Sequence, residues 1–231
     1  METLESGSFK LLSLLQKHRS AEGILGKDLG HLLYDGNKNM FQDSLDLLNI
    51  RKKNRILEIW PGHCAHLPQV MEQASGLRYF GLDLSKTMIE NAKRINGISV
   101  SGRKALFRSH DGVNVPYVND FFDRIVTINT IYLWQHPTRF LNEIYRVLKP
   151  GGICVITFVN ANSMKGLNLQ AEAFNLFDIP KFLRLVSETP FKHIDIQTRN
   201  ELEKTEKSKP KDREFLVATL MKSNTNAQIE I

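Results

Sequence analysis

A turn-forming run, Trp60-Pro61-Gly62, and a carboxylate, Asp83, each follow a largely apolar stretch and lie about 20 residues apart. In an open α/β sheet, a carboxylate at the end of the second strand can accept both hydrogen bonds of a ribose diol. Asp83 is not needed to cap the next helix, because Ser85 is available for that role. The spacing therefore indicates a ligand that contains a nucleoside.

Two further loops add polar side chains to the same predicted site. His110-Asp111-Gly112 follows a third stretch of strand-forming residues, and the segment from Asn129 to Tyr132 follows a fourth. The Asp111 carboxylate can accept a hydrogen bond from the exocyclic amine of a purine, with the Gly112 backbone at the ring edge. The alternative is that Asp111 is an ordinary turn aspartate, since Asp-Gly pairs are common in turns.

The elements that must position these residues alternate along the chain. We expect strands at residues 55–60, 78–83, 105–109, 122–129 and 153–158, and helices at residues 63–74, 86–95 and 138–148. Between the last helix and the last strand, the run from Lys149 to Gly152 predicts a helix stop. Such alternation implies a parallel sheet with right-handed crossovers, and the ligand then lies at the carboxyl ends of the strands.

The flanking segments extend this core. We expect further helices at residues 9–16, 38–49, 164–177 and 180–187, and an antiparallel hairpin of strands 191–198 and 215–221 with an exposed charged tip at 201–212. The predicted fold is a doubly wound, mostly parallel, seven-stranded Rossmann-like α/β sheet with a C-terminal antiparallel hairpin, a helical N-terminal extension and a helical lid between strands 5 and 6. We predict a single domain with a helical cap (1–50), a cofactor-binding core (51–160), a lid (161–190), a closing hairpin (191–222) and a tail (223–231).

Bulk composition narrows the functional classes. At 231 residues the chain suits one α/β domain, and no segment approaches the length of a membrane span. The net charge is +6, but the lysine and arginine residues are scattered among acidic residues, a pattern that does not favour nucleic-acid binding. The two cysteines, Cys64 and Cys154, fall in elements that suit a disulfide poorly, which is consistent with a reducing compartment. We expect a cytoplasmic protein, monomeric or homodimeric.

Five sequence motifs, in the order in which they occur along the chain, resemble those of the class I S-adenosylmethionine-dependent methyltransferases. The similarity is closest to the broad group of bacterial small-molecule methyltransferases whose prototype methylates quinone precursors, and it covers about residues 38 to 160. The motifs are Glu58-Ile-Trp60-Pro61-Gly62, Leu82-Asp83-Leu84-Ser85-Lys-Thr-Met88, Asp111-Gly112, the segment from Phe122 to Tyr132, and the segment from Glu143 to Gly152. Each motif alone is weak, but the set is specific.

The resemblance implies S-adenosylmethionine as cofactor, S-adenosylhomocysteine as product and a small molecule as methyl acceptor. At the methionine end, Glu58 and the turn through Gly62 face the amino-acid moiety, and Asn129 borders the sulfonium. Trp60 and Pro61 belong to the same cofactor-binding turn.

At the adenosine end, the resemblance implies that Asp83 holds the ribose hydroxyls and that Leu84 and Met88 line the adenine. Asp111 accepts from the adenine amine. The loop neighbours His110 and Gly112 complete the expected cofactor-binding set.

The glycine pattern departs from this family, which usually has glycine where this chain has Trp60 and Cys64. A dinucleotide site depends on such glycines, because they let the backbone approach a pyrophosphate. S-adenosylmethionine has no phosphate, and Pro61-Gly62 still suits a type II turn. The substitutions therefore count against a nicotinamide enzyme more than against a methyltransferase, although Trp60 can crowd the amino-acid tail.

Other residues near these motifs carry potential ligands or bases. His63, Cys64 and His66 share one turn, but neighbours on a helix point to different sides, so we expect no metal site and give His63 at most a lining role. Tyr132 and His136 follow the fourth strand and are our candidate catalytic residues. His136 is a candidate general base, and Tyr132 a candidate contact to substrate or cofactor.

Three functions remain in competition at this point. We favour a methyltransferase that acts on a small molecule. A second reading is a binding or regulatory protein of the same fold without turnover, in which Trp60 fills part of the tail pocket. The third is an RNA or protein methyltransferase, but the segment from Asn129 to Tyr132 lacks the two prolines typical of enzymes that methylate bases or amides, and we expect no nucleic-acid partner.

Overall fold

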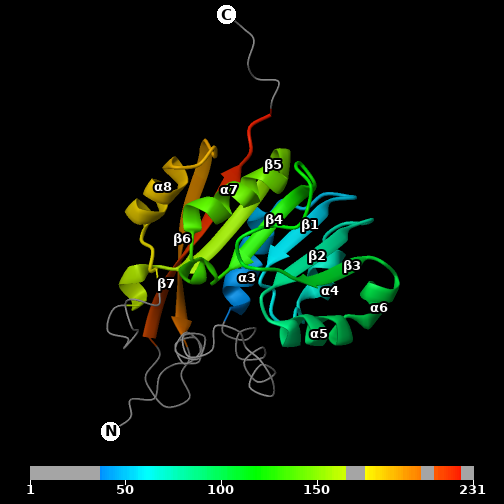
Figure 1. The fold of residues 1–231 in the computed structure, drawn as a ribbon. Coiled ribbons are helices and arrows are strands. Elements are labelled where there is room, and N and C mark those ends of the chain that lie inside the picture. Colours follow the sequence, from blue (N-terminus) through cyan, green and yellow to red (C-terminus); the bar gives the residue numbers. More distant parts are fainter. Residues whose placement is uncertain (1–36, 165–174, 204–210, 225–231) are drawn as a thin grey trace, which may run out of the picture.

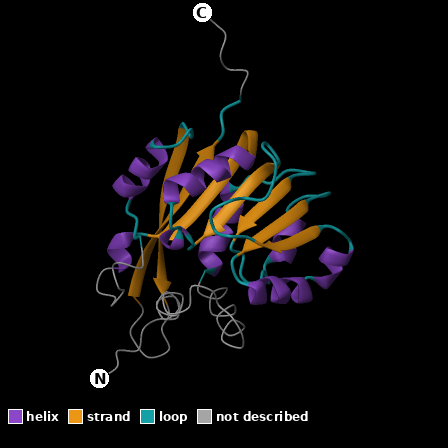
Figure 2. Ribbon diagram, in the orientation of Figure 1, coloured by secondary structure: helices purple, strands orange, loops and turns teal. Residues whose placement is uncertain are grey.

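The computed structural model describes residues 37–164, 175–203 and 211–224. These residues form a seven-stranded sheet with helices on both faces, as Figures 1 and 2 show. The strands are β1 (Arg55–Ile59), β2 (Arg78–Asp83), β3 (Ala105–Ser109), β4 (Phe122–Ile128), β5 (Leu148–Val159), β6 (His193–Glu203) and β7 (Lys211–Met221). The helices are α3 (Lys38–Leu47), α4 (Leu67–Glu72), α5 (Lys86–Ile95), α6 (Gly97–Ser101), α7 (Pro137–Val147) and α8 (Ile179–Ser187), with the short 3₁₀ helices η1 (Ile131–Leu133) and η2 (Ala161–Met164).

The strand order across the sheet is β3-β2-β1-β4-β5-β7-β6. Neighbours from β3 to β5 are parallel, and β7 is antiparallel to both β5 and β6. The chain moves outward from β1 through β2 to β3 and then returns to place β4 on the other side of β1. Ligands bind outside the carboxyl ends of the strands at such a reversal. The topology confirms the predicted fold class.

Helices cover both faces of the central strands, which is why β1 and β2 are buried along almost their whole length. Figure 1 shows α3 on one face of the sheet and α7 on the other. Helix α3 contacts β4, β5 and β7, and α7 contacts β5 and α8. The buried residues of α7 recur at helical spacing, as an amphipathic helix on a sheet requires; they are Phe140, Leu141, Ile144 and Val147.

The predicted helix at residues 63–74 is wrong at its beginning. Helix α4 spans only Leu67–Glu72, and Pro68 lies in its first turn, where proline is favoured. Cys64 has a φ of 54°, a left-handed value that cannot belong to a right-handed helix. By contrast, β2, β3 and α5 have the predicted bounds, while β1 and β4 each end one residue early.

The transition from α7 to β5 is tighter than predicted. We expected the strand to begin at Ile153, but β5 begins at Leu148, directly after the end of α7. The pairing with β4 is irregular between its first two pairs, so residues 149–152 form a bulge within the strand. Gly151 has a φ of 72°, as expected for a glycine that follows a helix stop.

The C-terminal hairpin is antiparallel, as predicted, but its strands are longer than predicted. We expected Glu201 in an exposed tip, yet it pairs with Arg213 in the β6–β7 ladder. The Arg213 side chain is 3% exposed, and its Nε donates to Glu201 Oε1 at 2.6 Å. A buried guanidinium needs such a countercharge, which explains why the strands continue through this pair. Asp212, which directly precedes Arg213, is exposed.

The remaining predictions concern the ends and the region before α8. Helix α3 ends two residues before its predicted end, and α8 agrees with the predicted helix at 180–187. The predicted helix at 9–16, most of that at 164–177 and most of the tail lie outside the described residues. Phe177 and Phe182 pack on Phe158 of β5, so these two aromatic rings belong to the core. Within the described ranges, no helix has the length and apolar character to cross a membrane.

Candidate functional site

The loop after β1 contains left-handed residues at three alternate positions. Trp60, Gly62 and Cys64 have φ values of 59°, 59° and 54°. A residue with a Cβ atom pays about 1–2 kcal/mol to adopt this conformation, whereas glycine adopts it freely. The sequence identified Trp60 and Cys64 as departures from a glycine pattern. The structure shows that the glycine-type backbone is kept at both positions in spite of their side chains.

This loop lies directly on β2. The Trp60 N–H donates to the Leu82 carbonyl at 2.6 Å. A Cβ atom on Gly81 would lie 3.1 Å from Cγ of Pro61 and 2.6 Å from Cδ1 of Phe107. Gly81 therefore provides the space in which the loop and β3 approach each other. Sequence analysis missed Gly81, although a glycine inside a strand is a known sign of close approach.

Asp83, the last residue of β2, connects the loop after β1 to the start of α5. Its Oδ2 accepts from the Gly62 N–H at 3.2 Å, and its Oδ1 accepts from the Ser85 N–H at 2.9 Å. Burial raises the pKa of this carboxyl to about 7, although the backbone N–H groups oppose the rise. The Ser85 hydroxyl accepts from the Met88 N–H, which confirms Ser85 as the cap of α5.

His110 joins the loop after β3 to the loop after β1. The Trp60 indole N–H donates to His110 Nε2 at 2.9 Å, and the Gly112 N–H points at His110 Nδ1 from 3.2 Å. Burial lowers the pKa of His110, which favours the neutral ring. Because a neutral imidazole has one acceptor nitrogen, the ring accepts from only one of these donors at a time.

Asp111 is exposed and organises its own turn. Its carboxylate accepts from the N–H groups of Val113 at 2.9 Å and Asn114 at 2.7 Å, and from the Asn114 side chain. These hydrogen bonds lower the pKa of Asp111 to about 2. The turn role that sequence analysis left open is therefore present, and contact with an adenine amine stays a prediction.

The expected adenine-lining residues lie beside this turn. A Cβ atom on Gly112 would lie 3.0 Å from Cδ2 of Leu84, so the Leu84 side chain borders the Gly112 backbone. Leu84 is half-buried, whereas Met88 is 3% exposed on the inner side of α5. The geometry therefore brings Leu84 and Gly112 together at one side of the site. Met88 is buried beneath them, on the inner side of α5.

The loop after β4 carries Asn129 in a left-handed conformation, with a φ of 55°. Its Nδ2 donates to Asn37 Oδ1 at 2.6 Å, and its Oδ1 accepts from the Tyr132 hydroxyl at 3.0 Å. Tyr132 is 2% exposed, its hydroxyl also bonds the backbone of Val159, and burial raises its pKa. His136 is exposed immediately before α7. The structure therefore joins Tyr132 to Asn129 and places His136 at the surface.

A buried polar network lies below the loop after β1. The Glu58 Oε2 accepts from the Tyr79 hydroxyl at 2.7 Å and lies 2.8 Å from His66 Nε2, while the Cys64 thiol donates to the Tyr79 oxygen at 3.1 Å. Burial acts to lower the pKa of His66, but the Glu58 carboxylate and Cys64 leave it well above its usual value. Sequence analysis placed Glu58 against the cofactor tail and missed Tyr79. The sequence offered one signal for Tyr79: it lies two residues before Gly81, so both residues are on the same face of β2.

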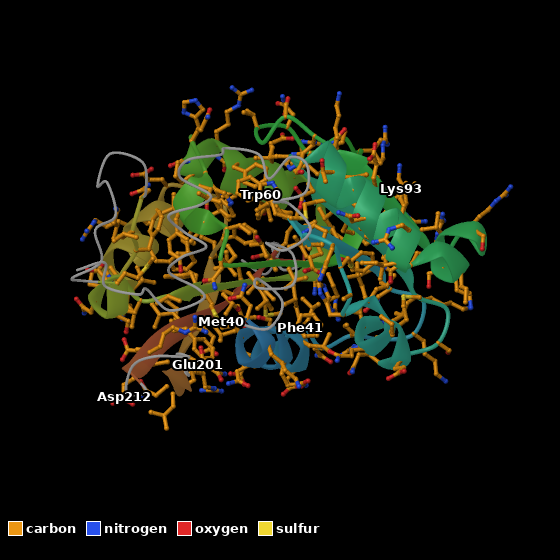
Figure 3. The ribbon with its side chains drawn as sticks, turned by 90° about the horizontal axis from the view of Figure 1, so that it is seen from below. Met40, Phe41, Trp60, Lys93, Glu201 and Asp212 are labelled. Atoms are coloured by element: carbon orange, nitrogen blue, oxygen red, sulfur yellow. The ribbon has the colours of Figure 1, made fainter. Side chains whose placement is uncertain are left out.

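Figure 3 looks onto the edge of the sheet where the parallel strands end. Trp60 lies on one side of this edge, and Met40 and Phe41 of α3 lie opposite it. The Asn129 Nδ2 also contacts the Met40 sulfur at 3.2 Å. The loops after β1, β2, β3 and β4 thus lie with α3 around the strand reversal between β1 and β4, where a ligand crevice is expected in such a sheet, and Asp83 offers a carboxylate for hydroxyl groups there.

A family model described as a methyltransferase domain matches residues 57–156. The chain is 28% identical over 130 residues to the uncharacterized methyltransferase YdaC of Bacillus subtilis, an alignment that covers 55% of this chain and 68% of YdaC. It is 32% identical over 117 residues to a phthiotriol/phenolphthiotriol dimycocerosates methyltransferase of Mycobacterium leprae, which covers 49% of this chain but only 40% of that protein.

Solved structures share the fold at low sequence identity. A chain of the complex between the Haloferax volcanii Trm112 methyltransferase activator and a methyltransferase has a TM-score of 0.72, 15% identity, and coverage of 86% of this chain and 95% of that chain. A phosphoethanolamine N-methyltransferase of Haemonchus contortus, solved with S-adenosylhomocysteine, has a TM-score of 0.64, 18% identity, and coverage of 80% and 53%.

Proposed function

We propose that this chain, which belongs to the class I S-adenosylmethionine-dependent methyltransferases, transfers the cofactor's methyl group to a small-molecule acceptor. The family is the premise, since the matched region runs from within β1 to within β5 and includes the loops after β1, β2, β3 and β4. The acceptor class and the roles of individual residues are the proposal.

The arrangement of Asp83 is the observation that supports this proposal most directly. Its carboxylate lies at the carboxyl end of β2, next to the strand reversal between β1 and β4, and backbone N–H groups from the loop after β1 and from the start of α5 hold both of its oxygens. A carboxylate fixed in this way is suited to the two hydroxyls of a ribose. Leu84 and the Gly112 backbone would then border the adenine, and the turn at Pro61-Gly62 would face the amino-acid tail.

Methyl transfer needs alignment more than acid or base catalysis. The bond between sulfur and the methyl carbon breaks as the acceptor's bond to that carbon forms, so the positive charge on sulfur disappears and the acceptor attacks in line. A general base is required only when the acceptor must lose a proton. Tyr132 is held by Val159 and its hydroxyl faces Asn129, so we propose that it positions Asn129 at the sulfonium. His136 stays a candidate base for an acceptor that reaches the surface.

The acceptor is proposed to carry an apolar part. The Mycobacterium leprae relative is named for phthiotriol and phenolphthiotriol dimycocerosates. In this chain Met40 and Phe41 of α3, which are apolar and buried, lie opposite Trp60 across the edge where the parallel strands end, so we propose that they form the apolar side of the crevice. Apolar walls also exclude water from the sulfonium during transfer.

Two measurements test the proposal. Calorimetric titration with S-adenosylmethionine and S-adenosylhomocysteine should show binding by the purified chain and much weaker binding by Asp83→Ala. Methyl-labelled cofactor, incubated with the protein and a cell extract, should then label organic-soluble small molecules. Absence of binding for both ligands, or label in RNA or protein alone, would overturn the proposal. Binding with no transferred label would instead favour the non-catalytic alternative.

A further inference from the structure

Three buried side chains below the cofactor loop converge on one point. Glu58, Cys64 and His66 are 4%, 0% and 7% exposed, and one ligand atom from each lies within 4.8 Å of the others. We expected no metal here because His63 and Cys64 would diverge on a helix. That helix begins only at Leu67, and the left-handed turn at Cys64 directs its sulfur toward His66 and Glu58.

We propose that Glu58, Cys64 and His66 bind a single zinc ion that fastens the end of the cofactor loop to β1. Thiolate, imidazole and carboxylate together are a donor set that zinc accepts and that magnesium and calcium do not favour. The Tyr79 oxygen, 3.1 Å from the Cys64 sulfur and 2.7 Å from Glu58 Oε2, is the nearest further donor. This site is separate from methyl transfer and needs no acceptor to be observed.

The interatomic distances are close to those of a tetrahedral site. With metal bonds of about 2.3 Å to sulfur and about 2.0–2.2 Å to nitrogen or oxygen, ligand atoms lie roughly 3.3–3.6 Å apart. The Cys64 sulfur is 3.8 Å from His66 Nε2, and that nitrogen is 2.8 Å from Glu58 Oε2. One separation must shrink and the other must grow, each by less than about 1 Å, which side-chain rotation provides.

The charges also balance. Zinc would bind the thiolate of Cys64 and the neutral imidazole of His66, so the thiol proton and any proton on the imidazole would pass to the solvent. The ion with one thiolate, one carboxylate and one neutral imidazole then has no net charge, as a buried site requires.

The site would link the backbone of β1 to the loop that follows it. Glu58 lies in β1, while Cys64 is the last of the three left-handed residues of the loop. A bond from zinc to the Cys64 sulfur would hold that residue in a conformation that its Cβ disfavours. The ion would therefore order the turn that faces the cofactor tail.

Metal content of the full chain tests this inference. The protein is freed of metal with a chelator, dialysed against zinc or cobalt at neutral pH, and analysed for bound metal and for the visible absorption of cobalt with a thiolate ligand. We expect one equivalent of either metal in the wild type. We also expect the melting temperature to rise with zinc.

Two variants separate the site from general effects. Cys64→Gly removes the sulfur at a position whose backbone suits glycine, so it should fold while losing the cobalt–thiolate absorption and the zinc-dependent rise in melting temperature. Cys154→Ser alters the chain's other cysteine, which is buried in β5, and should bind metal like the wild type. Less than one equivalent in the wild type, or equal binding by Cys64→Gly, would overturn the inference.

Discussion

The raised pKa of Asp83 predicts that cofactor affinity increases with pH across neutrality. Only the ionised carboxylate can accept from both ribose hydroxyls, and burial places its pKa at about 7. Because the pKa is raised, the carboxyl is mostly protonated at pH 6 and mostly ionised at pH 8. The binding-competent fraction therefore grows as pH rises through this window.

The magnitude follows from that fraction. With a pKa of about 7, roughly one tenth of the protein is ionised at pH 6 and roughly nine tenths at pH 8, so the apparent dissociation constant should fall about tenfold between them. The contribution of Asp83 to the stability of the ligand-free protein should change in the opposite direction. It is greatest below the ordinary aspartate pKa and declines as pH rises toward 7, by up to about 4 kcal/mol for a shift of about three units.

Calorimetry with 5′-methylthioadenosine is the suitable assay. This compound keeps the adenine, ribose and thioether of the cofactor and has no group that titrates between pH 6 and 8. The Asp83→Asn variant should bind weakly with a flat pH profile. A wild-type affinity that is flat or stronger at pH 6, or a tenfold slope retained in Asp83→Asn, would refute the reasoning.

Three further substitutions test the geometry of the site. With chelator present, Cys64→Gly should be about 1–2 kcal/mol more stable to urea than Cys64→Ala, because alanine keeps the strain of the left-handed backbone. Equal stabilities of the two variants would contradict this strain. Gly81→Ala should lower the free energy of unfolding by about 1–3 kcal/mol, because its Cβ meets Phe107 at 2.6 Å, and an unchanged urea midpoint would count against this crowding. Tyr132→Phe should cost about 1–3 kcal/mol by leaving the Val159 backbone without its partner and should reduce kcat by freeing Asn129; wild-type kcat would exclude the positioning role.

The central elements were predictable because their local signals agree. The largely apolar runs of β2 and β3 have strand length, and α5 begins after a serine that caps it. Asp83 could be identified because its place at the end of β2 follows from strand order alone. In each case the information lies within a few neighbouring residues.

Other features depend on contacts between distant residues and could not be read from local patterns. The left-handed turn at Cys64 ended the expected helix, and only the folded chain brings Glu58 and Tyr79 to its sulfur. The same holds for Glu201, which reads as part of a charged loop until buried Arg213 is found beside it. Buried polar partners are chosen by the tertiary structure rather than by periodicity.

The contact between Trp60 and His110 gives the protein a built-in optical probe. The chain has two tryptophans, and the other, Trp134, is 3% exposed beside Phe140. Replacing Trp134 with phenylalanine would leave one emitting indole, which is hydrogen-bonded to the His110 imidazole beside the proposed cofactor site. Its fluorescence would follow ligand arrival and departure in rapid mixing, without a label and without knowledge of the acceptor.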